Sequence, residues 1–250
     1  MKNVWLAVCV CSLAFVALVG FQKIEKPFHF ASFKAESVSD STDSAQIRVA
    51  SLPPWQRVYN SLHLKEAGLS LEGFRYAWNG FQKEKFTKSI LAIADFSQSS
   101  RHKRLYVIDL KENKLLYNTY VAHGRNSGEE YARQFSNRNS SYQSSLGFYR
   151  ALTTYQGKHG LSLKLQGLEP NINHHALERA IVMHGAEYVS EEFIRRTGRL
   201  GRSQGCPAIS VADTKKLISM LCNGAGLFLY YPDAHYLKQS KLIADLVSKG

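Results

Sequence analysis

Cysteine is scarce in this sequence. Of the four cysteines, Cys9 and Cys11 lie in an apolar N-terminal run, where they count as small hydrophobic residues, and only Cys206 and Cys222 remain for the rest of the chain. Two cysteines are too few for a disulfide framework, although a single bridge between them stays possible in an oxidising compartment. Internal repeats are also lacking.

Acidic residues are too few to balance the basic ones. The 20 Asp and Glu residues against 32 Lys and Arg residues leave a net charge of +12. This excess indicates attraction to an anionic partner such as nucleic acid, phospholipid head groups or acidic wall polymers, although solubility alone also explains it. With 250 residues and 44% hydrophobic residues, the chain is long and apolar enough for one globular domain plus a leader or tail.

The N-terminus has the pattern of an export signal. Lys2 precedes an apolar run of about 16 residues, from Val4 to Val19, which fits a signal-peptide core better than a full membrane span. No A-x-A cleavage pattern follows, so an uncleaved inner-membrane anchor is the alternative. Both interpretations predict a periplasmic or envelope protein and make nucleic acid a poor partner. The predicted parts are a signal peptide or anchor at 1–21, a flexible linker at 22–51, a domain at 52–233 and a C-terminal tail at 234–250.

The domain is predicted to be mostly β, of the α+β class. Two helices come first, one opened by Pro53 and Pro54 and ended by Gly68, the other capped by Ser70 and running to about Lys85. The aromatic stripe of the second helix indicates core packing rather than a ligand groove. β-rich runs follow, with one late helix at 210–221 that begins with a capping box; the strands are expected at 90–96, 105–110, 115–122, 145–155, 161–166, 180–184 and 227–231.

A histidine and a cysteine are the candidate catalytic residues. His184 ends a predicted strand and is followed by Gly185, and Cys206 lies in a tight G-R-S-Q-G-C-P loop. A thiol is mostly protonated at neutral pH, so it needs a base such as His184 beside it. Gly205 lets the chain approach closely, so that amides near Cys206 could face an oxyanion. The spacing alone is a weak signal, because lone cysteines and histidines are more often structural.

Longer blocks strengthen this hypothesis. The M-H-G-A and G-R-S-Q-G-C-P-A motifs, with the blocks at 104–137, 144–149 and 229–233, resemble the murein L,D-transpeptidase catalytic domain family, the YkuD-like L,D-transpeptidases. The resemblance covers about residues 52–233. It implies a β-sandwich-like mixed sheet with two N-terminal helices and one late helix.

The resemblance also implies a reaction. Cys206 would be the nucleophile and His184 the general base, while Ser203 and Gly205 shape the cysteine loop and the Cys206 amide helps to form the oxyanion hole. The enzyme would attack the stem-peptide bond before the terminal D-Ala and form an acyl-enzyme. An amine would then take the acyl group, giving a 3–3 crosslink, an anchored envelope protein or an exchanged D-amino acid. No metal or cofactor is needed, and carbapenems resemble the acyl donor.

Several site residues depart from the family pattern or carry a second interpretation. Gln204 stands where many members have a second histidine, and an amide can donate a hydrogen bond but cannot act as a base. Arg125, in the V-A-H-G-R-N-S-G block, could pair with a substrate carboxylate or lie in a surface turn. Arg202 and Gly185 are further candidates for substrate binding. The adjacent His174 and His175 indicate solvated loop residues rather than a metal site.

Three other functions remain open. The first is hydrolysis of the same bond by an L,D-carboxypeptidase or endopeptidase, for which the same residues would serve. The second is a non-catalytic wall-binding module, which would have no need of a thiol beside a base. The third, a general cysteine protease, lacks any resemblance to protease blocks.

Overall fold

The structure is a computed structural model that describes residues 51–247. The predicted leader and nearly all of the predicted linker lie outside the described residues. Within 51–247, no helix is both long enough and apolar enough to cross a membrane.

The two predicted N-terminal helices are present as α2 (Pro54–Ser61) and α3 (Leu71–Lys83). The side chain of Ser70 caps α3 by accepting a hydrogen bond from the Gly73 amide at 3.2 Å, as its position before the helix predicts. The first helix is shorter than predicted, because His63 adopts a positive φ of 50° and turns carry the chain from there to Gly68.

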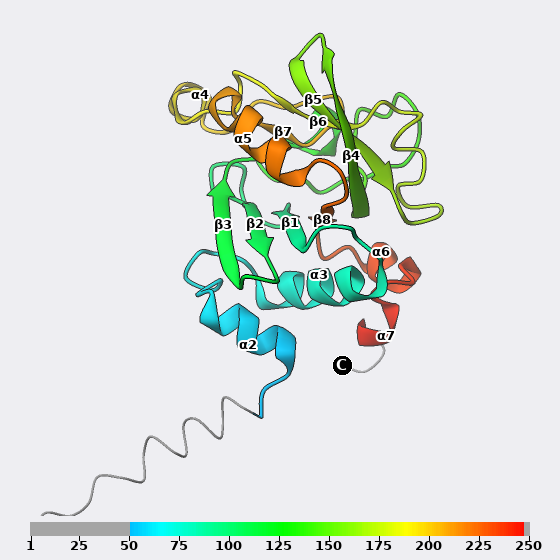
Figure 1. Cartoon of the computed structure of the whole chain (residues 1–250). Coiled ribbons are helices and arrows are strands. Elements are labelled where there is room, and N and C mark those ends of the chain that lie inside the picture. The colour runs from blue at the N-terminus through cyan, green and yellow to red at the C-terminus, as the bar shows by residue number, and fades with distance from the viewer. Residues whose placement is uncertain (1–50, 248–250) are drawn as a thin grey trace, which may run out of the picture. The chain divides into compact units, whose positions relative to one another are not determined.

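Eight strands form one mixed sheet in the order β3-β2-β1-β8-β4-β5-β6-β7 (Figure 1). Neighbouring strands are antiparallel except for the pairs β1–β8 and β6–β7. Just beyond β3, Ala122 bridges back to Ala208 in β7, so the sheet nearly closes on itself. The predicted mixed, mostly-β α+β fold is therefore confirmed. The strands are β1 (Ile90–Asp95), β2 (Leu105–Asp109), β3 (Lys114–Thr119), β4 (Gly147–Gly157), β5 (Gly160–Gly167), β6 (Val182–Gly185), β7 (Ala208–Ile209) and β8 (Gly226–Tyr230).

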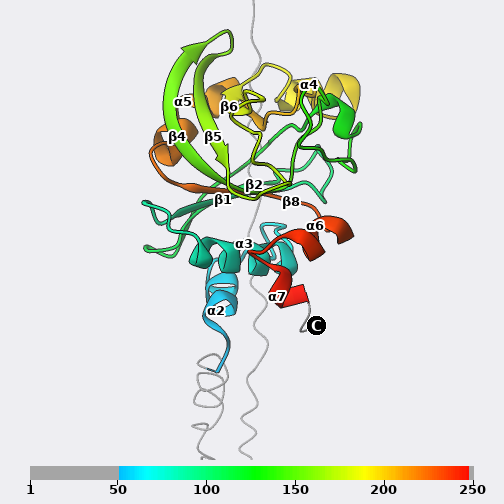
Figure 2. The same ribbon diagram turned by 90° about the vertical axis from the view of Figure 1, so that its right-hand side faces the viewer.

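The central strands separate two hydrophobic layers. In β1, Leu91 and Ile93 pack with α2 and α3, whereas Ala92 and Ala94 face the layer that contains Leu217 of α5 (Val211–Leu221). Figure 2 shows α2, α3, α6 and α7 on one side of these strands and α5 on the other. Because both faces of β1, β2 and β8 are buried, each is a nearly continuous apolar run in the sequence.

More helices follow the first strands than the one predicted. The predicted helix is α5, and its N-cap Ser210 accepts a hydrogen bond from the Asp213 amide at 3.0 Å. The segment predicted as a C-terminal tail carries short helices and buries Tyr236 and Ile243, so the folded domain continues beyond Asp233. The added helices are α4 (Glu191–Thr197), α6 (Ala234–Gln239) and α7 (Ala244–Val247).

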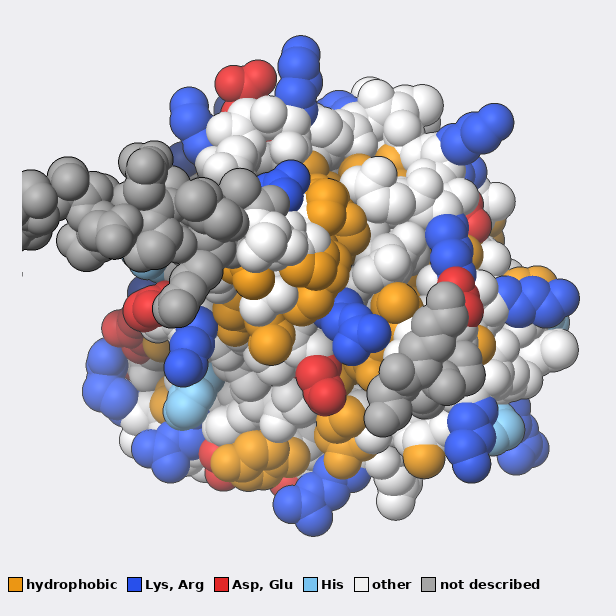
Figure 3. All heavy atoms as spheres, turned by 90° about the horizontal axis from the view of Figure 1, so that it is seen from below, with side chains coloured by type: hydrophobic (Ala, Val, Ile, Leu, Met, Phe, Trp, Pro, Cys, Tyr) orange, Lys and Arg blue, Asp and Glu red, His pale blue; other side chains and the backbone are white. Residues whose placement is uncertain are grey.

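The face on the side of α2, α3 and α7 is shown in Figure 3. Hydrophobic side chains gather near its centre, and Lys and Arg side chains lie around them. Trp55 of α2 and Trp78 of α3 are half-buried and pack against the hydrophobic layer that these helices cover. On this face the basic excess is therefore spread out rather than gathered into one patch.

Candidate active site

The cysteine loop, residues 201–207, lies between the end of α4 and strand β7. The segment after β3 holds one side of it through a bridge between Gly124 and Ser203. The Ser203 amide donates to the His123 carbonyl at 2.9 Å, and the Arg125 amide donates to the Ser203 carbonyl at 2.8 Å. The loop is thus fixed by backbone hydrogen bonds to a block more than 70 residues earlier in the sequence.

Ser203 and Gly205 set the shape of this loop. The Ser203 hydroxyl donates to the Cys206 carbonyl at 2.6 Å and accepts from the Gly205 amide at 3.0 Å. Gly205 has a φ of +120°, and a Cβ there would lie 2.8 Å from the Gln143 carbonyl oxygen, so the position requires glycine. Within the described chain, the Cys206 amide has no hydrogen-bond acceptor, and the exposed Gln204 side chain makes no hydrogen bond.

The thiol of Cys206 lies at the beginning of β6. Its sulfur accepts from the Val182 amide at 3.5 Å and faces the Ala180 carbonyl at 3.8 Å. Burial raises the pKa of the Cys206 thiol, while the Val182 amide and the positive charges of Arg179 and Lys158 act in the opposite direction. The net effect is a rise, so the resting side chain is a neutral thiol that needs a base to react.

His184 lies farther along the same strand, opposite Ala208 of β7. Its Nδ1 is 2.9 Å from the carbonyl oxygen of Gly185, and since a carbonyl only accepts, Nδ1 carries the hydrogen and Nε2 is the basic nitrogen of the neutral ring. Burial lowers the pKa of His184, the Gly185 carbonyl opposes this, and His159 and Lys158 lower the pKa further. A Cβ on Gly185 would lie 2.3 Å from the Thr214 hydroxyl oxygen, so Gly185 here is a point of close packing against α5.

The two predicted catalytic residues are neighbours of the same strand. His184 lies in β6, and Cys206 lies beside the beginning of β6, two residues before Ala208, the β7 residue that pairs with His184. No hydrogen bond joins the His184 ring to the thiol among residues 51–247. Catalytic hydrogen bonds are often long in an unliganded site and tighten with substrate, so their pairing stays a prediction.

Arg179 was not predicted from the sequence, yet it holds the loop that faces Cys206. Its guanidinium donates to the Ser136 carbonyl at 2.8 Å and to the Gln143 carbonyl at 2.6 Å. Its charge also lowers the thiol pKa of Cys206. No local pattern marks this arginine, because it meets the loop only through the tertiary fold.

The β4–β5 hairpin turn and one tyrosine also reach the site. Lys158 and His159 are the two turn residues between Gly157 and Gly160, which pair across the hairpin. The His159 ring stacks on His184 with centroids 4.3 Å apart and an angle of 19° between the planes. Burial and the nearby Cys206 thiol raise the pKa of Tyr188, which makes no side-chain hydrogen bond within the described chain.

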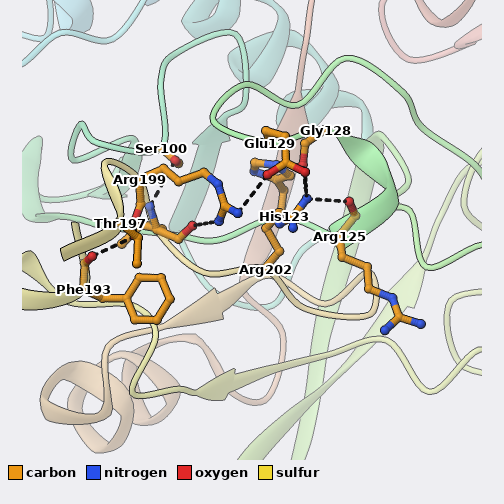
Figure 4. Close-up of polar contacts among 10 residues, drawn as sticks. Ser100, His123, Arg125, Gly128, Glu129, Phe193, Thr197, Arg199 and Arg202 are labelled. Atoms are coloured by element: carbon orange, nitrogen blue, oxygen red, sulfur yellow. Dashed lines mark hydrogen bonds and ion pairs between the residues drawn. The ribbon is translucent and has the colours of Figure 1, made fainter. Parts of the chain in front are cut away.

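Of the two predicted substrate-binding arginines, Arg202 belongs to the cysteine loop and Arg125 lies beside it, and their contacts differ. The guanidinium of Arg202 forms an ion pair with Glu129 at 2.5 Å, and Arg199 pairs with the same carboxylate at 2.8 Å (Figure 4). Arg125 points away from this cluster and stacks over the Tyr142 ring at 4.1 Å. Since Arg125 has no ion pair within residues 51–247, its charge is available to an anion.

A buried pair supports the cysteine loop from beneath. Arg104 is fully buried, and its Nη2 donates to Nδ1 of His123 at 2.8 Å. Nε2 of His123 therefore carries the hydrogen and donates to the Gly128 carbonyl at 3.2 Å. Burial and the Arg104 charge lower the pKa of His123 to about 3, so the ring is neutral at pH 7.

The remaining histidines and cysteines lie outside this arrangement. His174 and His175 are exposed turn residues, and Nδ1 of His175 lies 2.8 Å from the Glu178 carboxylate. Among the described residues, no three His, Cys, Asp or Glu side chains are grouped so that they could hold a metal ion. Cys206 and Cys222 are both free thiols, and Cys222 is half-buried.

Comparisons with solved structures give distant similarities to L,D-transpeptidases. One from Mycobacterium smegmatis is 12% identical, with 57% of this chain and 59% of that chain covered and a TM-score of 0.36. One from Stackebrandtia nassauensis is 18% identical, with 64% and 67% covered and a TM-score of 0.36. A third, solved in complex with imipenem, is 11% identical, with 57% and 59% covered and a TM-score of 0.35. This chain thus spans less than two thirds of the length of the first and third structures.

No curated protein sequence matches this chain significantly. A family model, in contrast, matches residues 65–230, which include β1 to β8, the His184 strand and the whole cysteine loop. This match covers well over half of the sequence. The chain therefore belongs to the L,D-transpeptidase catalytic domain family.

Proposed function

We propose that this protein is a peptidoglycan L,D-transpeptidase in which Cys206 attacks the stem-peptide bond before the terminal D-Ala. The observation that carries the proposal is the cysteine loop. Among residues 51–247, it presents on one residue a neutral thiol and a backbone amide without a hydrogen-bond acceptor, beside the strand that carries the neutral His184. A base and an oxyanion donor are the two elements that acyl transfer to a thiol requires.

The acylation half begins with Nε2 of His184, which takes the proton from the Cys206 sulfur as the sulfur bonds to the peptide carbonyl carbon. The Cys206 amide donates to the oxygen that becomes negatively charged. The bond from carbon to the D-Ala nitrogen then breaks, and His184 returns its proton to that nitrogen. The products are free D-Ala and a thioester on Cys206.

In the second half of the reaction, the acyl group moves from Cys206 to an acceptor. An acceptor amine attacks the thioester, His184 takes the proton that the amine loses, and the thiol leaves with its proton restored. The acceptor is a second stem peptide, an envelope protein or a free D-amino acid. If water attacks instead, the same residues make the enzyme an L,D-carboxypeptidase or endopeptidase.

The two predicted substrate-binding arginines, Arg125 and Arg202, have different proposed roles, one in binding the substrate and one in holding the cysteine loop. Within the part of the chain that the structure describes, Arg125 has no ion pair, and its charge beside the loop supports a role in binding a substrate carboxylate. Arg202 is engaged by Glu129 and by the Gly128 carbonyl, which supports a role in holding the loop rather than in direct recognition.

The site of action that fits this reaction is the cell envelope. The apolar run from Val4 to Val19 supports export to the periplasm, either as a cleaved signal or as an inner-membrane anchor. The excess of basic residues would favour retention near anionic wall or membrane surfaces. A non-catalytic wall-binding role is disfavoured, because binding alone does not require a thiol and a histidine on one strand edge.

The test is mass spectrometry of purified muropeptides after incubation with the protein. Crosslinked or exchanged products that disappear in Cys206→Ala and His184→Ala, and persist in a Cys222→Ala control, would support transpeptidation. Because nucleophile and base act as a unit, the double variant should lose little more than either single one. Trimmed peptides alone would assign hydrolysis, and unchanged muropeptides with folded wild-type protein would refute the proposal.

A further inference from the structure

The β4–β5 hairpin brings a second imidazole onto the proposed base. Ser162 of β5 pairs with His184 of β6, and the hairpin turn lies just before Ser162 in the chain. The turn folds back so that the His159 ring lies over the His184 ring, with centroids 4.3 Å apart and planes 19° apart. The outer part of β4 and the turn are exposed, so core packing does not force this contact.

The stack involves the face of the His184 ring and not its reactive nitrogen. Nδ1 of His184 is engaged by the Gly185 carbonyl at 2.9 Å, which fixes one end of the ring. His159 contacts the ring through its face and makes no side-chain hydrogen bond within residues 51–247. The ring is therefore held at one edge and on one face, and among residues 51–247 its Nε2 makes no hydrogen bond.

We infer that His159 is a positioning residue for the base: its ring packs on the His184 ring and holds it in the orientation in which Nε2 takes the proton of Cys206. The inference rests on the proposed function, since it assumes that His184 is the base. It assigns a catalytic purpose to the hairpin turn, which neither the motifs nor the family match marks.

The experiment measures the alkylation rate of Cys206 by iodoacetamide at neutral pH in the full chain, with peptide mapping to separate Cys206 from Cys9, Cys11 and Cys222. The variants are His159→Ala, His159→Phe and His184→Ala. His235→Ala is the matched control, because His235 is an exposed histidine on α6, far along the chain from the turn. Melting temperatures of all variants check that each protein is folded.

We expect His159→Ala to react about tenfold more slowly than the wild type, and His159→Phe to recover most of the rate, because its planar ring can still pack on His184. His235→Ala should match the wild type. A folded His159→Ala variant with the wild-type rate, or a His159→Phe variant as slow as His159→Ala, would overturn the inference alone. A wild-type rate in His184→Ala would show instead that the proposed base is wrong, and the inference would fall with it.

Discussion

Acid should destabilise this domain through His123, the buried histidine beneath the cysteine loop. The ring accepts a hydrogen bond from Arg104 at 2.8 Å, so a proton on Nδ1 would place two positive charges in contact. Burial and that arginine lower the pKa of His123 to about 3, whereas a histidine in an unfolded chain titrates near 6.5. The unfolded chain therefore binds the proton more tightly, and stability is lost as the pH falls below about 6.5.

The size of the effect follows from these two pKa values. Between pH 6.5 and pH 4.5 only the unfolded chain is protonated at this site, and each pH unit is worth about 1.36 kcal/mol. The loss by pH 4.5 is then about 2.7 kcal/mol, with no reduction for solvent screening because His123 is 1% exposed. This is a large part of the total stability of an ordinary domain, which is about 5–15 kcal/mol.

The assay is urea unfolding of wild type and His123→Asn from pH 7.5 to pH 4.5. Asparagine offers Arg104 an amide oxygen that does not titrate, so the variant should be less stable at pH 7.5 but lose about 2.7 kcal/mol less on acidification. The lowered pKa of His184 contributes to both proteins and cancels in the comparison. Parallel stability curves would refute the reasoning, and His235→Asn should leave the wild-type curve unchanged.

Three substitutions test the loop and its surroundings. Gly205→Ala should destabilise the domain by about 1–3 kcal/mol, because alanine at a φ of +120° is strained and its Cβ would lie 2.8 Å from the Gln143 carbonyl oxygen; an unchanged melting temperature would contradict this. Lys158→Gln should move the pH profile of Cys206 alkylation slightly upward, because its charge lowers the thiol pKa, while the matched change Lys238→Gln on α6 should not move it. Gln204→Ala should lower turnover without moving that profile, and a loss as complete as in His184→Ala would make Gln204 more than an assisting donor.

The parts of the fold that could be predicted are those with a local cause. The cap at Ser70 and the buried strands β1, β2 and β8 follow from side-chain patterns along the sequence. α6 and α7 escaped prediction because six and four residues are too few to show a helical period, and their burial depends on the core of the whole domain. The first helix ends early at a conformation of His63 that residue type does not indicate.

In the candidate site too, only the residues that belong to local sequence motifs could be predicted. Cys206 and His184 stand in recognisable motifs, and Ser203 and Gly205 are next to the cysteine. Arg179 and His159 come to the site from distant segments. Arg179 does so through a hydrogen bond to the Gln143 carbonyl, and His159 through stacking of its ring on His184. Contacts of this kind depend on strand register, such as the pairing of Ser162 with His184, and register is not visible in a single sequence.

The central claim is that Cys206 is the nucleophile of an acyl-transfer site. It is tested most directly by incubating the folded protein with a carbapenem and locating the adduct by mass spectrometry. We expect one covalent adduct on the peptide that contains Cys206, none on Cys222, and none at all in a Cys206→Ala variant that keeps the wild-type melting temperature. An adduct on another residue, or one that persists in Cys206→Ala, would contradict it.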